Sequence, residues 1–153
     1  MMNQVLEVIK NRRSVLHFET TPVSREKIRV ILEAGRWAPS YVNSQPWKFI
    51  VITDKEIKQK LSSFVAHGIG EAPVSIVVCV DPAVDPLHFI EDGAVAAQNM
   101  ALAAYSLGLH SCWIGPFNLR GEKESVEEKI KDILEIPRNY RVISLLPIGV
   151  ARL

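Results

Sequence analysis

The spacing of apolar residues along the chain alternates between the period of a helix and the length of a buried strand. Apolar positions at i, i+3, i+4 and i+7 predict helices over residues 3–11, from an N-cap at Ser24 to about Trp37, after Asp54, over 88–107, and after a capping box Ser125–Glu128. Short apolar runs predict strands over residues 47–53, 74–80, 111–114 and 140–149. Helices alternate with strands, which indicates an α/β or α+β domain around a central sheet.

Two of these elements are apolar on more than one side. The run "VSIVVCV" (74–80) has no polar face, so it predicts a strand buried on both faces. The stretch "GAVAAQNMALAAYSLG" within residues 88–107 is apolar nearly all round and rich in alanine, and Gly108 follows it in the position of a helix C-cap. Because one small domain can hardly surround such a helix, we expect a partner subunit to help cover it.

Composition narrows the class of protein. The chain has 153 residues, 48% of them hydrophobic, and a net charge of +1, which predicts a single domain over residues 1–153 with its own core. A charge so near zero gives no reason to expect a nucleic acid or an anionic membrane as partner. No apolar run is long enough to span a bilayer, and the first residues form an amphipathic pattern and not a secretory signal. We expect a cytoplasmic protein whose two cysteines, Cys79 and Cys112, are buried reduced thiols.

Most familiar catalytic motifs are absent. There is no GxSxG, HExxH, P-loop or EF-hand pattern, and "GIGEAP" (68–73) breaks off before completing a dinucleotide-binding GxGxxG. The four histidines lack ligand spacing, so no metal site is expected. Glu91 and Asp92 are adjacent on a predicted helix and point apart, which favours a solvated face over an acid/base pair.

The segment "NRRS" (11–14) carries candidate binding chemistry. Two arginines and a serine at the end of a helix offer forked, charge-assisted donors for a phosphate or a carboxylate. Cations in the last turn also complement the negative end of the helix dipole, and from these residues alone that structural role is the better interpretation.

Three separate segments together resemble the nitroreductase family of flavoenzymes. The first is "RRSVLHFETTPVSREKIRVILEAGRWAPSYVNSQPWKFIVI" (12–52), the second "DGAVAAQNMALAAYSLGLHSCWIGPF" (92–117) and the third "VISLLPIGVA" (142–151). The resemblance implies an α+β fold of the three-layer α/β type, with a central mixed sheet flanked by helices, in an intertwined homodimer. It also implies one FMN at each of two sites that both chains build.

The resemblance assigns roles to particular residues. Phosphate and ribityl contacts fall to Arg12, Arg13 and Ser14, and in this context the binding role replaces the structural one. The flavin's reactive edge falls to Ile114 and Gly115, where a backbone N–H can bond the N5 atom and a missing Cβ permits close approach. The turn in "APSYVNSQPW" (38–47) is expected to reach the ring of a flavin whose phosphate the other subunit holds, through Pro39, Ser40, Tyr41 and Asn43. Gln45 and Trp47 are expected to be structural.

The chain also departs from the family pattern. Leu16 stands where a second basic residue is common, and Tyr41 stands where a small residue is common, so that it narrows the pocket or stacks on the ring. Near the end of the sequence only Arg152 is available as an additional cation for the phosphate.

The expected function is that of an FMN-dependent oxidoreductase. It would move hydride from NAD(P)H through flavin N5 to nitroaromatics, quinones or similar flat acceptors by a ping-pong mechanism, with no protein residue acting as nucleophile. Two alternatives stay open: a flavin-binding carrier or sensor without significant turnover, and a helix-covered interaction protein in which "NRRS" only caps a helix. The sequence leaves the physiological acceptor and the preference for NADH or NADPH undetermined.

Overall fold

One antiparallel sheet forms the centre of the molecule. The computed structural model describes residues 3–121 and 124–152. Its strands β1 (Trp47–Ile52), β2 (Val74–Val80), β3 (His110–Ser111) and β4 (Arg141–Gly149) pair in the order β1-β2-β4-β3. All pairings between these four strands are antiparallel. The parallel component of the expected mixed sheet is limited, among the described residues, to the isolated bridge from Ser14 to Ser111 beside β3. The helical pair between β1 and β2 returns the chain to the end of the sheet where β1 finished, whereas a parallel pairing needs a crossover to the opposite end.

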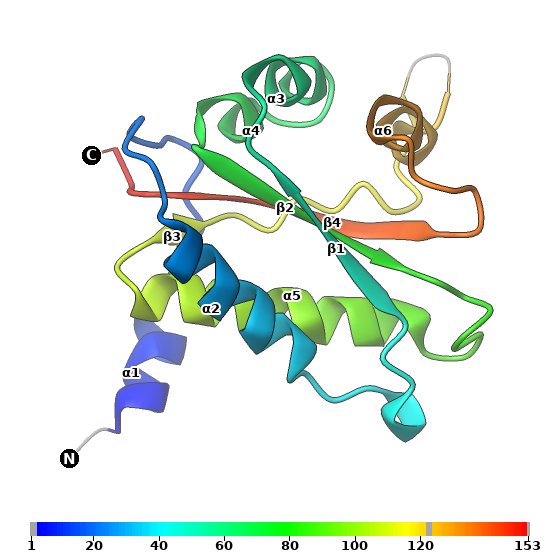
Figure 1. The fold of residues 1–153 in the computed structure, drawn as a ribbon, viewed down its shortest axis with the longest axis horizontal. Helices are drawn as coiled ribbons and strands as arrows, with labels where there is room; N and C mark the ends of the chain where they lie inside the picture. The colour runs from blue at the N-terminus through cyan, green and yellow to red at the C-terminus, as the bar shows by residue number, and fades with distance from the viewer. Residues whose placement is uncertain (1–2, 122–123, 153) are drawn as a thin grey trace.

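Helices cover both faces of this sheet and give the expected three layers (Figure 1). On one face lie α1 (Gln4–Asn11), α2 (Arg25–Arg36) and α5 (Phe89–Ser106), and on the other lie α3 (Lys55–Ser62), α4 (His67–Glu71) and α6 (Val126–Leu134). A short 3-10 turn, η1 (Tyr41–Asn43), joins α2 to β1. The fold class is therefore α+β, as expected.

Strand β2 contributes to both cores, which confirms the expectation of burial on two faces. Val74, Ile76 and Val78 pack with Ile31 of α2 and Met100 of α5. The alternate residues, Val77 and Cys79, pack on the other side of the sheet with residues of α3, α4 and α6. Every residue of β2 is buried, as period-2 alternation between two covered faces requires.

Side-chain caps fix where three of the helices begin, at the positions expected. Ser24 Oγ accepts from Lys27 N at 3.3 Å, Asp54 Oδ1 from Ile57 N at 2.9 Å and Ser125 Oγ from Glu128 N at 3.0 Å. Each bond satisfies a backbone donor that the first turn of a helix leaves unpaired. At the far end of α5, Gly108 has φ +78°, the left-handed conformation of a C-cap.

Helix α5 lies close against the sheet because small residues face it. A Cβ on Gly93 would come within 2.7 Å of Ile143 Cγ1 and 3.1 Å of Val80 Cγ1, so only glycine permits this approach. The opposite side of α5 stays partly uncovered, with Ile90 42% and Val95 36% exposed. This agrees with the expectation that the domain alone does not surround the helix.

Three details differ from the sequence-based expectations. Helix α4 and the turn η1 were not predicted, because five and three residues are too few to show a period. The strand expected at 111–114 is His110–Ser111, and Ile114 pairs with Leu145 only through an isolated bridge. Cys79 is buried, and burial raises the pKa of its thiol to about 12; Cys112 is only half-buried.

Candidate functional site

The residues expected at the phosphate, Arg12 to Ser14, lie where α1 ends and the chain meets β3. Ser14 forms a parallel bridge with Ser111, and Val15 N donates to Ser111 O at 3.0 Å. This pairing places the arginines beside the segment that leads from β3 to Gly115. We call residues 12–15 and 111–115 together the Arg12 end.

Arg12 and Arg13 differ in what their side chains contact. The Arg13 guanidinium folds back and donates to Lys10 O at 2.8 Å and Arg12 O at 2.9 Å, so it caps the C-terminus of α1 as the structural interpretation of "NRRS" required. The Arg12 guanidinium forms no hydrogen bond or ion pair with any described residue. Burial raises the pKa of the Cys112 thiol, while the Ser14 hydroxyl and the Arg12 charge oppose that rise, which places both groups near Cys112.

Arg152 is close to this region but already has a partner. Its Nη2 donates to Glu71 Oε2 at 3.0 Å, and its N–H donates to His17 O at 2.9 Å. Although burial acts to raise the pKa of Glu71, the N–H of Phe18, the His17 ring and the Arg152 charge together lower it. Glu71 is therefore ionised at neutral pH and competes with any anion for Arg152.

Ile114 and Gly115 differ in the backbone hydrogen bonds that their amide groups form. Ile114 N donates to Leu145 O at 3.0 Å, and Leu145 N donates back to Ile114 O at 2.8 Å, so the Ile114 amide belongs to the sheet. The Gly115 N–H has no acceptor within the described part of the chain, and Gly115 is exposed. Of the two amides, that of Gly115 can donate to a ligand.

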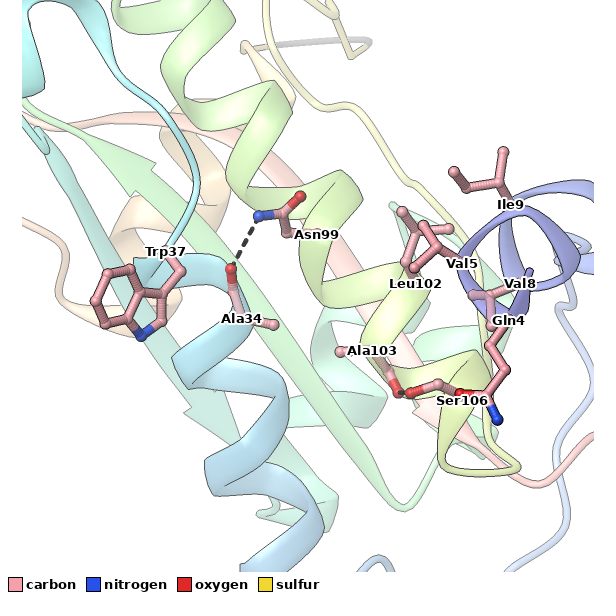
Figure 2. A pocket seen from close by; sticks show the side chains of 10 residues that line it. All are labelled: Gln4, Val5, Val8, Ile9, Ala34, Trp37, Asn99, Leu102, Ala103 and Ser106. Carbon is pink, nitrogen blue, oxygen red and sulfur yellow. Dashed lines mark hydrogen bonds between the residues drawn. The ribbon is translucent and has the colours of Figure 1, made fainter.

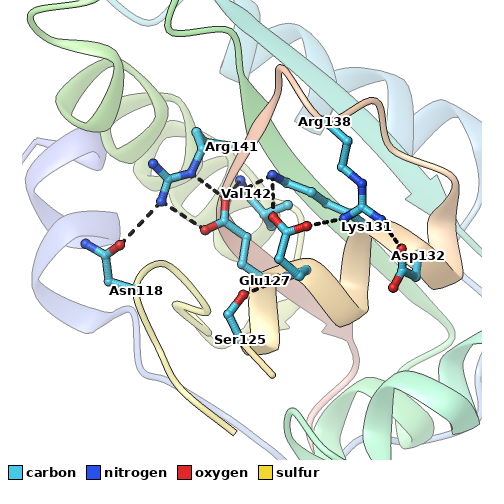
Figure 3. Close-up of polar contacts among 9 residues, drawn as sticks. Asn118, Ser125, Glu127, Lys131, Asp132, Arg138, Arg141 and Val142 are labelled. Atoms are coloured by element: carbon cyan, nitrogen blue, oxygen red, sulfur yellow. Dashed lines mark hydrogen bonds and ion pairs between the residues drawn. The ribbon is translucent and has the colours of Figure 1, made fainter. Parts of the chain in front are cut away.

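A buried ionic network fixes the segment that follows Gly115 (Figure 3). Arg141 donates two hydrogen bonds to Glu127, from Nε to Oε1 at 2.8 Å and from Nη2 to Oε2 at 3.0 Å. The guanidinium carbon of Arg141 lies 4.3 Å from the centre of the Phe117 ring. Arg141 also donates to Asn118 Oδ1 at 3.3 Å. Glu127 is 5% and Lys131 is 3% exposed. The opposite charges of this network therefore compensate one another for the hydration that burial removes. Strand β4 and α6 thereby position the chain just after Gly115.

The expected ring contacts lie in a strained turn, residues 39–45, which we call the Tyr41 loop. Val42, Asn43 and Gln45 have φ of 45°, 56° and 50°, the left-handed region that a β-branched residue such as Val42 rarely occupies. Gln45 N donates to Ser40 Oγ, and Gln45 Nε2 donates to Asn43 Oδ1, both at 2.9 Å. Gln45 thus satisfies local groups, and Trp47 is buried in β1, in line with their expected structural roles. Tyr41 and Asn43 are exposed.

Asp92 binds the Tyr41 loop to α5, which corrects its assignment to a solvated face. Its carboxyl group is 4% exposed and accepts from Tyr41 N at 3.0 Å and Ser44 Oγ at 3.5 Å. Glu91 does face solvent, as expected. The sequence reasoning missed Asp92 because the loop that covers it lies about fifty residues earlier in the chain. An acidic residue within an alanine-rich helix was the available signal.

The two groups of expected site residues lie at opposite ends of α5. Asp92, in its first turn, holds the Tyr41 loop, whereas Tyr105 and Ser106, in its last turn, share a surface pocket with Asn11, next to Arg12. Asp92 and Tyr105 are thirteen positions apart along the helix, which corresponds to about 20 Å. Within one chain the structure therefore does not bring Arg12 and Asn43 together.

An apolar groove lies between α1, α2 and α5 (Figure 2). Its volume is about 410 Å³, and Val5, Trp37 and Leu102 are among its lining residues. None of the eight residues of α1 is buried, although the helix is amphipathic, and its apolar residues Val5, Leu6 and Ile9 are 64%, 54% and 51% exposed. Trp37, at the end of α2, is 79% exposed. This is an apolar face without a covering element in the single chain.

Other kinds of site were sought in the same part of the chain. No three His, Cys, Asp or Glu side chains among the described residues are close enough together to hold a metal ion. None of the helices in residues 3–121 and 124–152 has the length and apolar character needed to cross a bilayer.

Known proteins resemble this chain along most of its length. The family model described as the nitroreductase family matches residues 9–69 and 66–150. A protein of Methanothermobacter thermautotrophicus with the provisional name NADH dehydrogenase/NAD(P)H nitroreductase is 37% identical over 149 residues, which cover 95% of this chain and 76% of that protein. The FMN reductase [NAD(P)H] of Bacillus subtilis is 31% identical over 97% of this chain and 66% of its own length.

A solved structure has the same fold. The FMN-dependent nitroreductase of Clostridium difficile superimposes with a TM-score of 0.91 at 32% identity, covering 95% of this chain and 87% of the other. The family model and this structure each match nearly all of the sheet and the helices described above. The chain therefore belongs to the nitroreductase family.

Proposed function

We propose that this oxidoreductase binds FMN and moves hydride from NAD(P)H to flat, electron-poor acceptors such as nitroaromatics and quinones. The observation that carries the proposal is the Arg12 end. There, a guanidinium without a partner among the described residues and an exposed serine lie beside the segment that leads to Gly115, whose amide N–H has no acceptor in that part of the chain. The relatives of the chain are named as FMN-dependent nitroreductase and FMN reductase.

The donors present fit the chemistry of FMN. Arg12 and Ser14 would hold the phosphate, because a free guanidinium and a hydroxyl supply charge-assisted and neutral hydrogen bonds to its oxygens. The Gly115 N–H would bond the reactive edge of the ring. Pro39, Ser40, Tyr41 and Asn43 would contact the ring from the other subunit. Arg13 and Arg152 would add positive charge at a distance, since both guanidinium groups already have protein partners.

Two chains are needed for such a site, and we infer a homodimer. The apolar face of α1, Trp37 and the uncovered side of α5 supply a surface that a second copy would cover. The separation of about 20 Å along α5 keeps Arg12 and Asn43 of one chain apart, whereas a two-fold axis across α5 would bring the Arg12 end of one chain to the Tyr41 loop of the other. Each site would then combine the Arg12 end of one chain with the Tyr41 loop of the other.

FMN, when bound, supplies the two-electron redox chemistry, and the protein supplies binding, orientation and electrostatics. The Gly115 N–H would favour a flavin ring that carries negative charge, as preorganised donors do, and the Arg12 charge would balance the phosphate. No side chain needs to act as nucleophile, and protons can come from water. The donor and the acceptor would use the same space above the ring in turn, which gives ping-pong kinetics.

An anaerobic absorbance experiment tests this function. The purified protein should be yellow, should bleach when NADH or NADPH is added, and should recover its colour with a quinone or a nitroaromatic. A yellow protein that neither cofactor bleaches would support a carrier or sensor in place of an enzyme. A colourless protein that takes up no FMN would refute the flavin site itself.

A further inference from the structure

The Tyr41 loop holds a conformation that it would not adopt alone. Three of its residues, Val42, Asn43 and Gln45, have positive φ, and Val42 is 79% exposed, so no core packing holds it there. Backbone strain of this kind persists only where surrounding groups enforce it. The loop therefore needs an anchor outside itself.

The anchor is a single buried carboxyl group. Asp92 accepts from Tyr41 N at 3.0 Å and from Ser44 Oγ at 3.5 Å, which ties the residues on both sides of the strained Val42 and Asn43 to the first turn of α5. The same side chain lines a shallow pocket of about 260 Å³ together with Pro39, Ser40 and Tyr41. Asp92 thus sits behind the residues that we expect to face the ring.

A second buried carboxyl group, that of Asp85, interacts with that of Asp92. Asp85 is 2% exposed, and its Oδ1 accepts from Leu87 N and His88 N, both at 3.0 Å. Its Oδ2 is buried without a partner unless Asp92 donates a proton to it. Two interacting carboxyl groups in a buried place disfavour double ionisation, and a proton shared between them would also satisfy the unpartnered Asp85 Oδ2.

Other titratable groups surround this pair. His88 packs on the Tyr41 ring with centroids 4.5 Å apart, and its Nδ1 lies 3.8 Å from Glu91 Oε1. In the preceding turn, the Asp81 carboxylate accepts from Ala83 N and Asn139 Nδ2. These groups are engaged elsewhere, and none of them donates to Asp85 Oδ2.

We propose that Asp92 is a positioning residue for the flavin: Asp92 and Asp85 share one proton, and this hydrogen-bonded pair holds the strained Tyr41 loop against α5. The proposal rests on the proposed function, because the loop is placed at a ring only if FMN binds. It adds a part of the site that touches neither the cofactor nor a substrate.

The proton on the pair makes the loop sensitive to pH. Burial raises the pKa of Asp92 and the neighbouring Asp85 raises it further, against hydrogen bonds from Tyr41 and Ser44. Burial also acts to raise the pKa of Asp85, but hydrogen bonds from His88 N, Asp92 and Leu87 N lower it overall. One proton is therefore retained between the two values. As the pH rises through the folded pKa of Asp92, the pair loses its hydrogen bond and the two carboxylates repel each other, which displaces Asp92 from the Tyr41 loop. Asp92 is the side chain that is displaced, because Asp85 is still held by two N–H donors at 3.0 Å.

Binding of FMN and riboflavin to the flavin-free protein, followed by quenching of flavin fluorescence from about pH 5 to pH 9, tests this role. Asp92→Ala should weaken both ligands by about tenfold or more, and equally, since the loop serves the ring and not the phosphate. Asp92→Asn keeps an acceptor for Tyr41 N and a donor for Asp85, so it should bind like the wild type at low pH. It should also lose the wild-type decline at high pH. Glu91→Gln removes the neighbouring exposed carboxylate and should reproduce the wild-type profile.

Hydrogen exchange at the Tyr41 amide of the flavin-free protein supplies a readout that does not depend on FMN. Protection should fall with rising pH in the wild type, stay constant in Asp92→Asn and be lost in Asp92→Ala. An Asp92→Asn protein that follows the wild-type pH profile, or an Asp92→Ala protein with unchanged flavin affinity, would overturn the proposal. Failure of the wild type to bind either flavin would instead refute the proposed function, and with it the role of the loop at a ring.

Discussion

Arg12 and Arg13 are neighbours in sequence, yet only one has a guanidinium available for a ligand. Arg13 caps α1, whereas Arg12 has no partner among the described residues. Arg12→Ala should therefore weaken FMN binding by about 1.5–3 kcal/mol, roughly ten- to a hundredfold. Riboflavin lacks the phosphate, so its affinity should barely change, and fluorescence titration with both ligands measures the difference.

The matched control for Arg12 is Arg13→Ala, which removes the same charge from the next residue. It should change the affinity for FMN less than Arg12→Ala does, and it should cost stability through the lost cap, about 1 kcal/mol in urea unfolding. Equal loss of FMN and riboflavin in Arg12→Ala would show that this arginine supports the fold.

Helix α6 and strand β4 are joined by ions that the protein buries. Glu127→Ala would leave Arg141 without its principal partner and Val142 N without its acceptor, whereas Lys131 would keep Glu128 at 3.0 Å. The change should lower the free energy of unfolding by about 3 kcal/mol. Asp132→Ala, which removes an exposed partner of Arg138 on the same helix, should cost less than about 1 kcal/mol. Urea denaturation compares the two, and equal small effects would mean that the buried pairs are easily replaced by water.

At the level of elements, local patterns were sufficient where the residues that decide them are near in sequence. The caps at Ser24, Asp54 and Ser125 are such cases, and so is the two-sided burial of β2. The antiparallel pairing of β1 with β2 could not be predicted from local patterns, because it depends on where the helical pair α3 and α4 returns the chain. The burial of Asp92 was missed for the same reason, since its covering loop comes from a distant segment.

The same limit applied to the candidate site, where the sequence indicated residues but not their tertiary contacts. The resemblance named Arg12 and Gly115, but it could not separate them from Arg13 and Ile114, which are equally good matches to the motif. The separation came from contacts: Arg13 bonds carbonyl oxygens of its own helix, and the Ile114 amide joins the sheet. Side-chain and backbone partners of this kind depend on tertiary packing and leave no trace in residue spacing.

At the scale of the whole molecule, the exposed face of α1 predicts a dimer. Ile9→Glu should convert the protein to monomers in sedimentation velocity at micromolar concentration, because it places a charge on that apolar face. Val84→Glu is the matched control, since Val84 is also 51% exposed but lies outside the groove, and it should leave the dimer intact. A wild-type protein that sediments as a stable monomer would refute the homodimer.

The proposal that each site combines the Arg12 end of one chain with the Tyr41 loop of the other can be tested by complementation. Arg12→Ala and Asn43→Ala should each damage the sites of a homodimer. In a mixed dimer, one site carries both changes and the other carries neither. Refolding the two variants together should restore activity up to about half of the wild type per heterodimer. Verified heterodimers no more active than the parent proteins would place Arg12 and Asn43 in one site from a single chain.

Because the two ends of α5 lie far apart, each FMN would need two chains, and the fraction of the protein that retains FMN would depend on the protein concentration. If each FMN bridges two chains, its binding and subunit association stabilise one another by the same free energy, as thermodynamic linkage requires. Dilution would then release flavin as well as subunits, and added FMN would reverse both. A cell that makes little of this protein would hold it largely as colourless single chains, so the activity per molecule would rise with expression and with the supply of flavin.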